Sequence, residues 1–319
     1  MAPIVPKVII HGGAGRSLGQ RGGVAAIRQE LHTIVGQIYQ RAQAGARAKD
    51  CVMLGCELLE DAPRFNAGYG SVLQSDGQVR LSAGLMDGQT QRFSGVINAS
   101  RVQHPIALAA YLQAQPDRVL SDLGSMELAR ELGLPPFDPI TDQRLQEWLQ
   151  ERTHNFQQAS AGVVAATTDV ADGIEATARR GTIGVVVLDQ AGHLAAGTST
   201  GGKGLERVGR VSDSAMPAGT YANPYAAVSC TGIGEDIIDE ALAARVVVRV
   251  TDGLEIAAAL TKSFAEATAN GRDFGAIAID HQGAIAWGKT SDVLLAAYHT
   301  GITLGDTLEL PPGTQTGHC

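Results

Sequence analysis

The sequence is poor in aromatic and charged residues, which make up only 4% and 18% of its 319 positions. Small aliphatic side chains must therefore fill the interior, since 44% of the chain is hydrophobic. A net charge of −8 and the lack of any basic run argue against nucleic acid as a partner, because such binding requires a positively charged surface. No run of 18 apolar residues occurs, so we expect no membrane span and no membrane partner.

Motifs for common metal, redox and serine chemistry are also missing. The cysteines, Cys51, Cys56, Cys230 and Cys319, match no zinc or redox spacing. No H-E-x-x-H pair and no G-x-S-x-G elbow occurs, which argues against a zinc hydrolase and a standard α/β-hydrolase. The N-terminus lacks the charged start and long apolar stretch of a secretory signal. We expect reduced thiols in a cytoplasmic protein.

Glycine is abundant, with 39 residues, and predicts many tight turns. A strand at 7–11 runs into a glycine turn, in which we expect His11 to be structural rather than a ligand. Apolar spacing predicts helices at about 24–44, 49–60, 105–133, 143–152, 234–250 and 254–270. Hairpins are predicted around turns at 75–77, 190–192 and 281–283. Strand pairs in both halves, with helices between them, indicate a layered α+β fold.

Residues 197–204, GTSTGGKG, resemble a loop that binds nucleotide phosphates. Such a loop needs Ser or Thr after its lysine as a magnesium ligand, and here Gly204 follows Lys203. The residues that follow lack the periodicity of a helix whose N-terminus could face a phosphate. We therefore disfavour a nucleotide-binding module, which stays open as one alternative.

The junction at Gly181 and Thr182 is the most informative stretch. A polar segment from about 137, which includes an expected linker at about 155–181, ends there, and a buried strand begins. One interpretation is a linker that enters a strand. Another is a self-cleaving bond, because a threonine hydroxyl can attack the preceding carbonyl and glycine permits the strained backbone this needs. Cleavage would free an α-amine with a pKa of about 7.7, which can activate the threonine's own hydroxyl.

Seven segments together resemble the plant-type L-asparaginase/isoaspartyl peptidase family of N-terminal-nucleophile (Ntn) threonine hydrolases. These segments are IIHGGAG (9–15), RFNAGYGSVLQSDG (64–77), LMDG (85–88), GTIGVVVLDQAGHLAAGTSTGGK (181–203), GRVSDS (209–214), AGTYAN (218–223) and SCTGIGE (229–235). The resemblance implies the Ntn-hydrolase fold, an α+β four-layer αββα sandwich, as a single domain over 1–319. It also implies cleavage between Gly181 and Thr182 into an α subunit, 1–181, and a β subunit, 182–319, assembled as a dimer of such pairs.

The same resemblance assigns the catalytic residues. Thr182 matches the nucleophile and Thr200 the second threonine that hydrogen-bonds near it. Thr231 and Gly232 match the oxyanion donors, a hydroxyl and a backbone N–H, and Asn66 matches an asparagine near the nucleophile. The hairpin argues independently that Thr200 lies beside Thr182, because residues near the two ends of a hairpin are neighbours across its ladder. No cofactor is implied for catalysis.

Arg210, Asp213 and Gly234 match the family's substrate anchors, together with Thr231 and Gly232. A guanidinium can hold the substrate α-carboxylate with two parallel hydrogen bonds, and a carboxylate can hold the α-ammonium. This pair selects a free aspartyl group linked through its side chain, as in asparagine or a β-aspartyl dipeptide. The alternative for an R-x-x-D pair is an ordinary surface ion pair.

One loop matches the family's structural sodium site, which uses backbone carbonyls. The implied ligands are the carbonyls of Leu59, Glu60, Ala62, Phe65, Ala67 and Tyr69. Two positions depart from the family pattern: Ser212 in RVSDS, where members often carry glycine, and Ser82 in LSAGLMDG, where they often carry aspartate. These departures leave the preference between L-asparagine and β-aspartyl dipeptides open.

The sequence therefore predicts an autoprocessing hydrolase of β-aspartyl amide bonds that releases L-aspartate through a threonine-bound acyl-enzyme. Two alternatives remain besides the nucleotide-binding module. A glycosylasparaginase would remove asparagine from glycans, but such proteins follow a secretory route and no signal peptide is evident. A catalytically silent, unprocessed homologue would share the fold without the activity.

Overall fold

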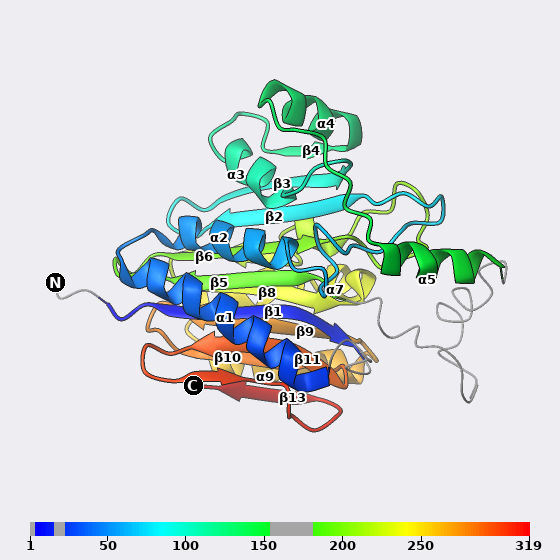
Figure 1. The fold of residues 1–319 in the computed structure, drawn as a ribbon. Coiled ribbons are helices and arrows are strands. Elements are labelled where there is room, and N and C mark those ends of the chain that lie inside the picture. Colours follow the sequence, from blue (N-terminus) through cyan, green and yellow to red (C-terminus); the bar gives the residue numbers. More distant parts are fainter. Residues whose placement is uncertain (1–3, 16–22, 154–180) are drawn as a thin grey trace.

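The strands of this computed structural model, which describes residues 4–15, 23–153 and 181–319, form two sheets. The larger sheet has the order β12 (Leu304–Asp306), β11 (Val293–His299), β1 (Lys7–Gly15), β5 (Ile183–Leu188), β6 (Leu194–Thr200), β2 (Leu81–Asp87), β3 (Arg92–Ala99) and β4 (Val119–Ser121). The smaller sheet has the order β13 (Gln315–His318), β10 (Ile285–Lys289), β9 (Phe274–Asp280), β8 (Ala226–Gly232) and β7 (Thr220–Ala222). Figure 1 shows their strands stacked side by side.

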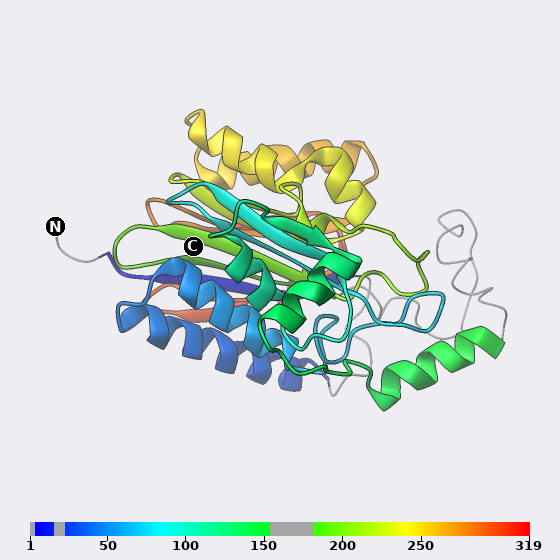
Figure 2. The ribbon, with the colours of Figure 1, turned by 90° about the horizontal axis from the view of Figure 1, so that it is seen from above.

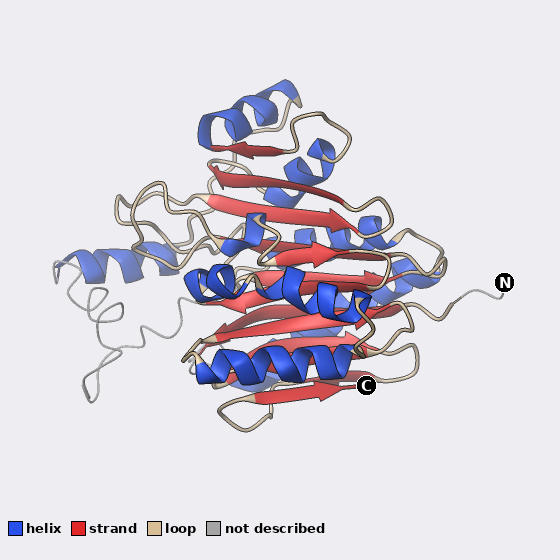
Figure 3. Cartoon of the chain, turned by 180° about the vertical axis from the view of Figure 1, so that it is seen from behind, coloured by secondary structure: helices blue, strands red, loops and turns tan. Residues whose placement is uncertain are grey.

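Helices cover the outer face of each sheet (Figures 2 and 3). On the larger sheet, α1 (Gly23–Gln43) and α2 (Ala48–Glu60) lie over its centre, and α3 (Pro105–Leu112) and α4 (Asp122–Glu131) lie over the β2–β3 end. On the smaller sheet, α8 (Leu242–Thr251) and α9 (Ile256–Ala269) follow the short α7 (Gly234–Glu240). The helix α5 (Asp142–Thr153) extends beside this body.

The apolar run of β5 is explained by its burial on both faces. Because side chains alternate across a strand, Val185 and Val187 join the core under α1 and α2, whereas Val186 faces the other sheet. There it packs with Ile9 and Ile277 in the core between the sheets. A separate core lies between the smaller sheet and α8 and α9. Continuous hydrophobicity at 183–188 thus marks the centre of the molecule.

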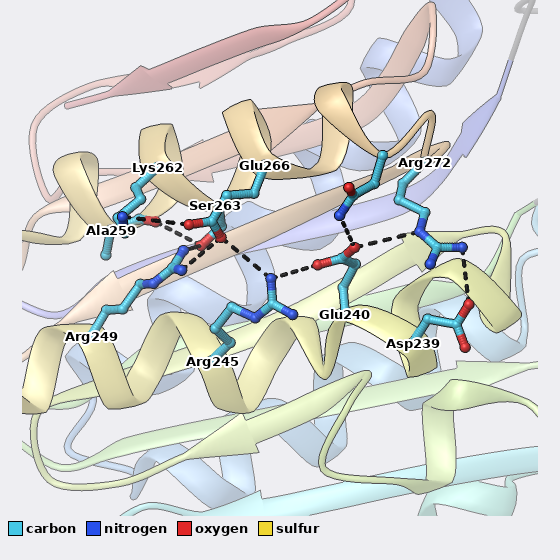
Figure 4. A network of polar contacts seen from close by, with 10 residues as sticks. Asp239, Glu240, Arg245, Arg249, Ala259, Lys262, Ser263, Glu266 and Arg272 are labelled. Carbon is cyan, nitrogen blue, oxygen red and sulfur yellow. Dashed lines mark hydrogen bonds and ion pairs between the residues drawn. The ribbon is translucent and has the colours of Figure 1, made fainter.

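Ion pairs join the outer turns of α7, α8 and α9, as Figure 4 shows. Arg249 of α8 contacts Glu266 of α9 at 2.6 Å, and Arg245 bridges Glu240 of α7 to the same Glu266 at 2.5 and 3.3 Å. Glu240 is buried, and the other side chains of these pairs are partly exposed. Their effect here is positional, because they join α7, whose first residue belongs to the candidate site, to the two longer helices.

Several predicted elements are confirmed, with ends shifted by a few residues. Helices α1, α2, α5 and α9 and the hairpins β5–β6 and β9–β10 lie where periodicity predicts them. The helix predicted over 234–250 is interrupted at Ala241, whose left-handed backbone (φ 45°) separates α7 from α8. The helix predicted over 105–133 is wrong as one element, because the strand β4 separates α3 from α4.

Two turn predictions are wrong. Residues 75–77 do form a turn, but no paired strands flank it; β2 begins at Leu81 and pairs with β3 and β6 instead. The glycine turn after 7–11 is also absent, because β1 continues to Gly15 with an irregularity between His11 and Ala14. Beyond His11 only β11 pairs with this segment, Ala14 with Leu294 and Gly15 with Val293, whereas the β5 ladder ends at His11.

All four cysteines are free thiols, as expected. Across the described ranges, no helix has the length and apolarity needed to cross a membrane. The predicted linker, about 155–181, lies outside the described residues except for Gly181. The cytoplasmic location stays a prediction.

Candidate active site

Thr182 and Thr200 lie together at the open end of the β5–β6 hairpin. The ladder pairs Ile183 with Ser199, so the next residues outward, Thr182 and Thr200, are neighbours. The Thr182 hydroxyl donates to Thr200 Oγ1 at 3.0 Å, and both side chains are buried. The proximity predicted from the hairpin is therefore confirmed.

The loop after Thr200 holds that threonine rather than a phosphate. The backbone N–H of Gly202 donates to Thr200 Oγ1 at 3.1 Å. No helix begins directly after Lys203; the next helical element in this described stretch is a single 3-10 turn, η2 (Asp213–Ala215). The phosphate-loop interpretation lacks the helix N-terminus that it requires, and the glycines serve close backbone approach.

Asn66 holds the carbonyl just before Thr182. Its backbone N–H donates to the Gly181 oxygen at 3.1 Å. Its side chain spans two loops, because Nδ2 donates to the Gly202 oxygen at 2.6 Å and Oδ1 accepts from the Val72 N–H at 2.9 Å. The residue is fully buried. Asn66 therefore joins the Gly181–Thr182 bond to the loop that follows Thr200.

Thr231 and Gly232 end β8 in the second sheet. The Thr231 side-chain oxygen accepts from the Ala14 N–H at 3.2 Å, which leaves the hydroxyl hydrogen available to a further acceptor. Gly232 has φ 137°, and a Cβ there would lie 2.5 Å from the Phe274 Cα. Only glycine fits this position. Its N–H follows Thr231 directly in the chain.

Sequence reasoning missed the contact between His11 and Thr182. The buried His11 Nδ1 lies 3.0 Å from the Thr182 carbonyl oxygen, and Nε2 lies 2.9 Å from Ser229 Oγ. Burial lowers the pKa of His11 to about 3, despite the opposing bond to Thr182. The apolar residues before His11 predict its burial, but its partners are 171 and 218 residues away in the sequence.

Arg210 is paired with a residue that the sequence did not single out as its partner. Its Nε and Nη2 donate to the two carboxylate oxygens of Glu235 at 3.1 and 3.0 Å. Lys203 contacts the same carboxylate at 3.3 Å. Partial burial opposes ionisation of Glu235, but the bonds from Arg210 prevail and lower its pKa to about 2. Among the described residues, Nη1 of the guanidinium has no partner, so it can donate to another carboxylate.

Asp213, by contrast, is a buried carboxyl group without an ion pair in the described part of the chain. Its Oδ2 has no hydrogen-bond partner there. Burial raises the pKa of Asp213 to about 7, although the charge of Arg210 opposes this. The surface ion pair considered for Arg210 and Asp213 is therefore wrong, and the site holds an acidic group suited to receive a cation.

Two glycines make room around this carboxyl group. A Cβ at Gly234 would lie 2.5 Å from Arg210 Nη2 and 2.8 Å from Asp213 Oδ1. A Cβ at Gly219 would lie 2.4 Å from Asp213 Oδ2. Gly234 thus lies between the two predicted anchors, where any side chain would occupy the space that they face.

The two departures from the family pattern lie close to this region. Ser82 pairs with Thr200 across β2 and β6, and its hydroxyl accepts from the Asn98 N–H at 3.1 Å. The Asn98 amide donates to the Arg210 carbonyl at 3.1 Å. Ser82 therefore supports the Arg210 loop through one intermediary. The Ser212 hydroxyl is buried without a partner in the described residues. The effect of Ser82 and Ser212 on substrate preference stays a prediction.

The loop at 59–69 brings backbone carbonyls together beside the end of α2. A Cβ at Gly68 would lie 2.5 Å from the Glu60 carbonyl oxygen, which shows that the loop closes on the end of α2. The carbonyls of Glu60 and Ala62 each accept one backbone N–H and keep a second lone pair, whereas that of Leu59 accepts from both Asp61 and Ala62. Those of Phe65, Ala67 and Tyr69 accept none from the described residues. Neutral oxygen donors on one loop fit a hard cation.

Comparison with known proteins identifies the family. A family model described as asparaginase matches residues 4–309. The chain belongs to the asparaginase family. Within it, an isoaspartyl peptidase/L-asparaginase from a Nostoc species is 62% identical over 314 residues, covering 98% of this chain and 98% of the relative. A Synechocystis protein of the same name is 62% identical over 315 residues, with 99% and 94% covered. An isoaspartyl peptidase from Salmonella typhimurium is 35% identical over 303 residues, with 91% and 94% covered.

Proposed function

We propose that this member of the asparaginase family is an isoaspartyl peptidase/L-asparaginase that hydrolyses β-aspartyl amide bonds and releases L-aspartate. One observation carries the proposal. The Thr182 hydroxyl donates a hydrogen bond to Thr200, and the carbonyl of the preceding residue, Gly181, accepts one from Asn66. The names of the relatives, which are 62% identical over nearly the whole chain, support the same activity.

The first reaction is self-cleavage. Thr182 Oγ1 attacks the Gly181 carbonyl carbon, and the oxygen that becomes negative already accepts the Asn66 N–H at 3.1 Å. The C–N bond breaks, the Thr182 nitrogen takes a proton and leaves as an amine, and an ester remains. Water hydrolyses this ester. The products are a chain that ends at Gly181 and a chain that begins with a free amine at Thr182.

Substrate hydrolysis then uses the same hydroxyl. The Thr182 α-amine accepts its proton, and Oγ1 attacks the side-chain carbonyl of the substrate. The Thr231 hydroxyl and the Gly232 N–H donate to the oxyanion. Thr200 orients the attacking hydroxyl. Loss of ammonia or an amino acid leaves an aspartyl ester, which water hydrolyses to L-aspartate.

Recognition of the aspartyl group follows from the charges of the pocket. The Arg210 edge that Glu235 leaves open binds the α-carboxylate. Asp213, buried without a cationic partner in the described chain, binds the α-ammonium. Gly234 lies between them and leaves room for the Cα of the substrate. These groups require both a free α-amine and a free α-carboxylate.

The wider assignments accompany this proposal. The two sheets with helices on both outer faces support a four-layer αββα sandwich. We further propose one domain that is cleaved into 1–181 and 182–319, a dimer of such pairs, and a cytoplasmic location. A structural sodium ion on the carbonyls of the 59–69 loop fits their donor chemistry, and the reaction itself needs no cofactor.

Mass spectrometry and a threonine series test the proposal. Purified protein should separate under denaturing conditions into two species divided between Gly181 and Thr182. Thr182→Ala should remain one chain and hydrolyse a β-aspartyl dipeptide at least about 1,000-fold more slowly, whereas Thr182→Ser should retain cleavage. Full turnover by the alanine variant would refute the mechanism. Faster hydrolysis of a glycan–asparagine substrate than of the dipeptide would favour a glycosylasparaginase.

A further inference from the structure

We infer that His11 is a positioning residue for Thr182. It holds the Thr182 carbonyl by a hydrogen bond, and a buried chain of hydroxyl groups from the second sheet orients the His11 ring. The inference rests on the proposed function, because it concerns the geometry of that nucleophile. Thr182 lies just before β5, so its carbonyl lacks a place in the ladder. His11 Nδ1, 3.0 Å away, supplies the partner.

The direction of each hydrogen bond can be assigned. A carbonyl oxygen only accepts, so His11 Nδ1 carries the hydrogen that points at Thr182. The fully buried ring is neutral, since burial lowers its pKa to about 3. Nε2 must therefore accept, and the Ser229 hydroxyl, 2.9 Å away, donates to it. The tautomer of His11 is thus set by a partner at each nitrogen.

The chain continues through two threonines. Because the Ser229 hydrogen is used on His11, the 2.7 Å contact between Ser229 and Thr198 requires Thr198 to donate. The Thr220 hydroxyl, 2.5 Å from Thr198 Oγ1, shares its one hydrogen between Thr198 and the Ser214 carbonyl, 2.9 Å away. All of these side chains are fully buried. Thr198 therefore supports Ser229, which orients the residue that holds the nucleophile.

A glycine keeps the crossing open between the sheets. Gly184 pairs with His11 across β1 and β5. A Cβ at Gly184 would lie 2.0 Å from Ser229 Oγ and 2.2 Å from His11 Nε2. The His11–Ser229 bond therefore runs directly over this glycine. Burying polar side chains lowers stability unless each of them has a hydrogen-bond partner. This chain of side chains ends on the carbonyl of the nucleophile, Thr182.

The consequence is that Thr182 is held on both sides. Asn66 holds the carbonyl before it, and His11 holds the carbonyl after it. The second bond survives self-cleavage, because the Thr182 carbonyl belongs to the bond that is not cut. His11 should therefore influence both the rate of self-cleavage and kcat. It should leave KM largely unchanged, since Arg210 and Asp213 bind the substrate.

Isosteric substitutions test this role. Asparagine places an N–H where Nδ1 lies, whereas leucine fills similar space without one. We expect His11→Leu to slow self-cleavage and kcat at least about 100-fold, as an ångström-scale displacement of a reacting group does. His11→Asn should recover at least about tenfold of this loss. His281→Leu is the matched control, because its Nδ1 also contacts a carbonyl, that of Tyr225, but at the exposed far end of β9.

The outcomes separate the inference from the proposed function. If the wild-type chain neither cleaves nor hydrolyses the dipeptide, the proposed function fails. If the wild type is active and His11→Leu matches it, or His11→Asn is no faster than His11→Leu, the inference is overturned. A second measurement needs no His11 variant to fold: nitrogen NMR of the uncut Thr182→Ala protein should show His11 as the neutral Nδ1–H tautomer at pH 6–8. An Nε2–H tautomer or a charged ring would overturn it.

Discussion

Replacing Asp213 with asparagine should stabilise the fold at neutral pH while impairing substrate binding. The carboxyl group is 3% exposed, and burial raises its pKa to about 7 from an ordinary 3.8. One tenfold change in an equilibrium constant corresponds to about 1.4 kcal/mol, so this difference corresponds to roughly 4 kcal/mol. Asparagine keeps the shape and removes the charge whose burial carries this cost.

The sign of the pH dependence follows from proton binding. Between pH 3.8 and about 7 the folded protein retains a proton on Asp213 that the unfolded chain has lost. The free energy of unfolding therefore falls as pH rises through this window, and the deficit stays constant above it. The Asp213→Asn variant does not lose stability in this way. Its free energy of unfolding should nearly equal that of the parent at pH 4 and exceed it by up to roughly 4 kcal/mol at pH 8.

Urea unfolding at pH 4 to 8 measures this difference. Thr182→Ala is the parent, because it keeps the chain in one piece and avoids the separate unfolding of two subunits. Asp117→Asn, at an exposed position, controls for the loss of one negative charge. If the Asp213→Asn and parent curves run parallel across this range, the buried-charge argument is refuted. In the active enzyme, KM should rise as pH falls below about 7, because the protonated group cannot bind the substrate ammonium.

Three further substitutions test the neighbouring groups. Glu235→Gln should raise KM for L-asparagine about tenfold or more with little effect on kcat, because Arg210 loses a charge-assisted partner; an unchanged KM would contradict this. Thr200→Val should slow turnover about two- to tenfold through loss of one hydrogen bond, and Thr200→Ser should restore it. Gly234→Ala should raise KM at least about 100-fold, because its Cβ enters the space between Arg210 and Asp213; calorimetric titration with L-aspartate would reveal retained binding if this is wrong.

Local pattern predicted the parts of the fold that depend on neighbours in the chain. Local pattern predicted helices at about 24–44 and 49–60, which the structure places at 23–43 and 48–60, and the apolar runs around 190–192 predicted a hairpin. Hairpin geometry alone placed Thr200 beside Thr182. Periodicity failed where distant strands decide, as in the glycine-rich end of β1, which stays extended because it pairs with β11.

The roles of the candidate residues came from resemblance to the family, and the sequence could not supply their partners. Arg210 is three residues from Asp213, a spacing that also fits an ion pair. Only the folded chain shows that Arg210 pairs with Glu235, while Asp213 has no ion pair among the residues that the structure describes. A carboxyl group isolated in this way has a different charge at neutral pH from one in an ion pair.

What the sequence by itself determined is the layered α+β organisation, the hairpin that joins two threonines and the match to one family of hydrolases. What only the tertiary structure decided is which distant groups meet. His11 reaches Thr182 and Ser229 because β1 lies beside β5 and the second sheet packs across both. Such contacts depend on the pairing order of strands, which local propensity does not encode, and they set the charge and orientation of the groups that we propose carry out the chemistry.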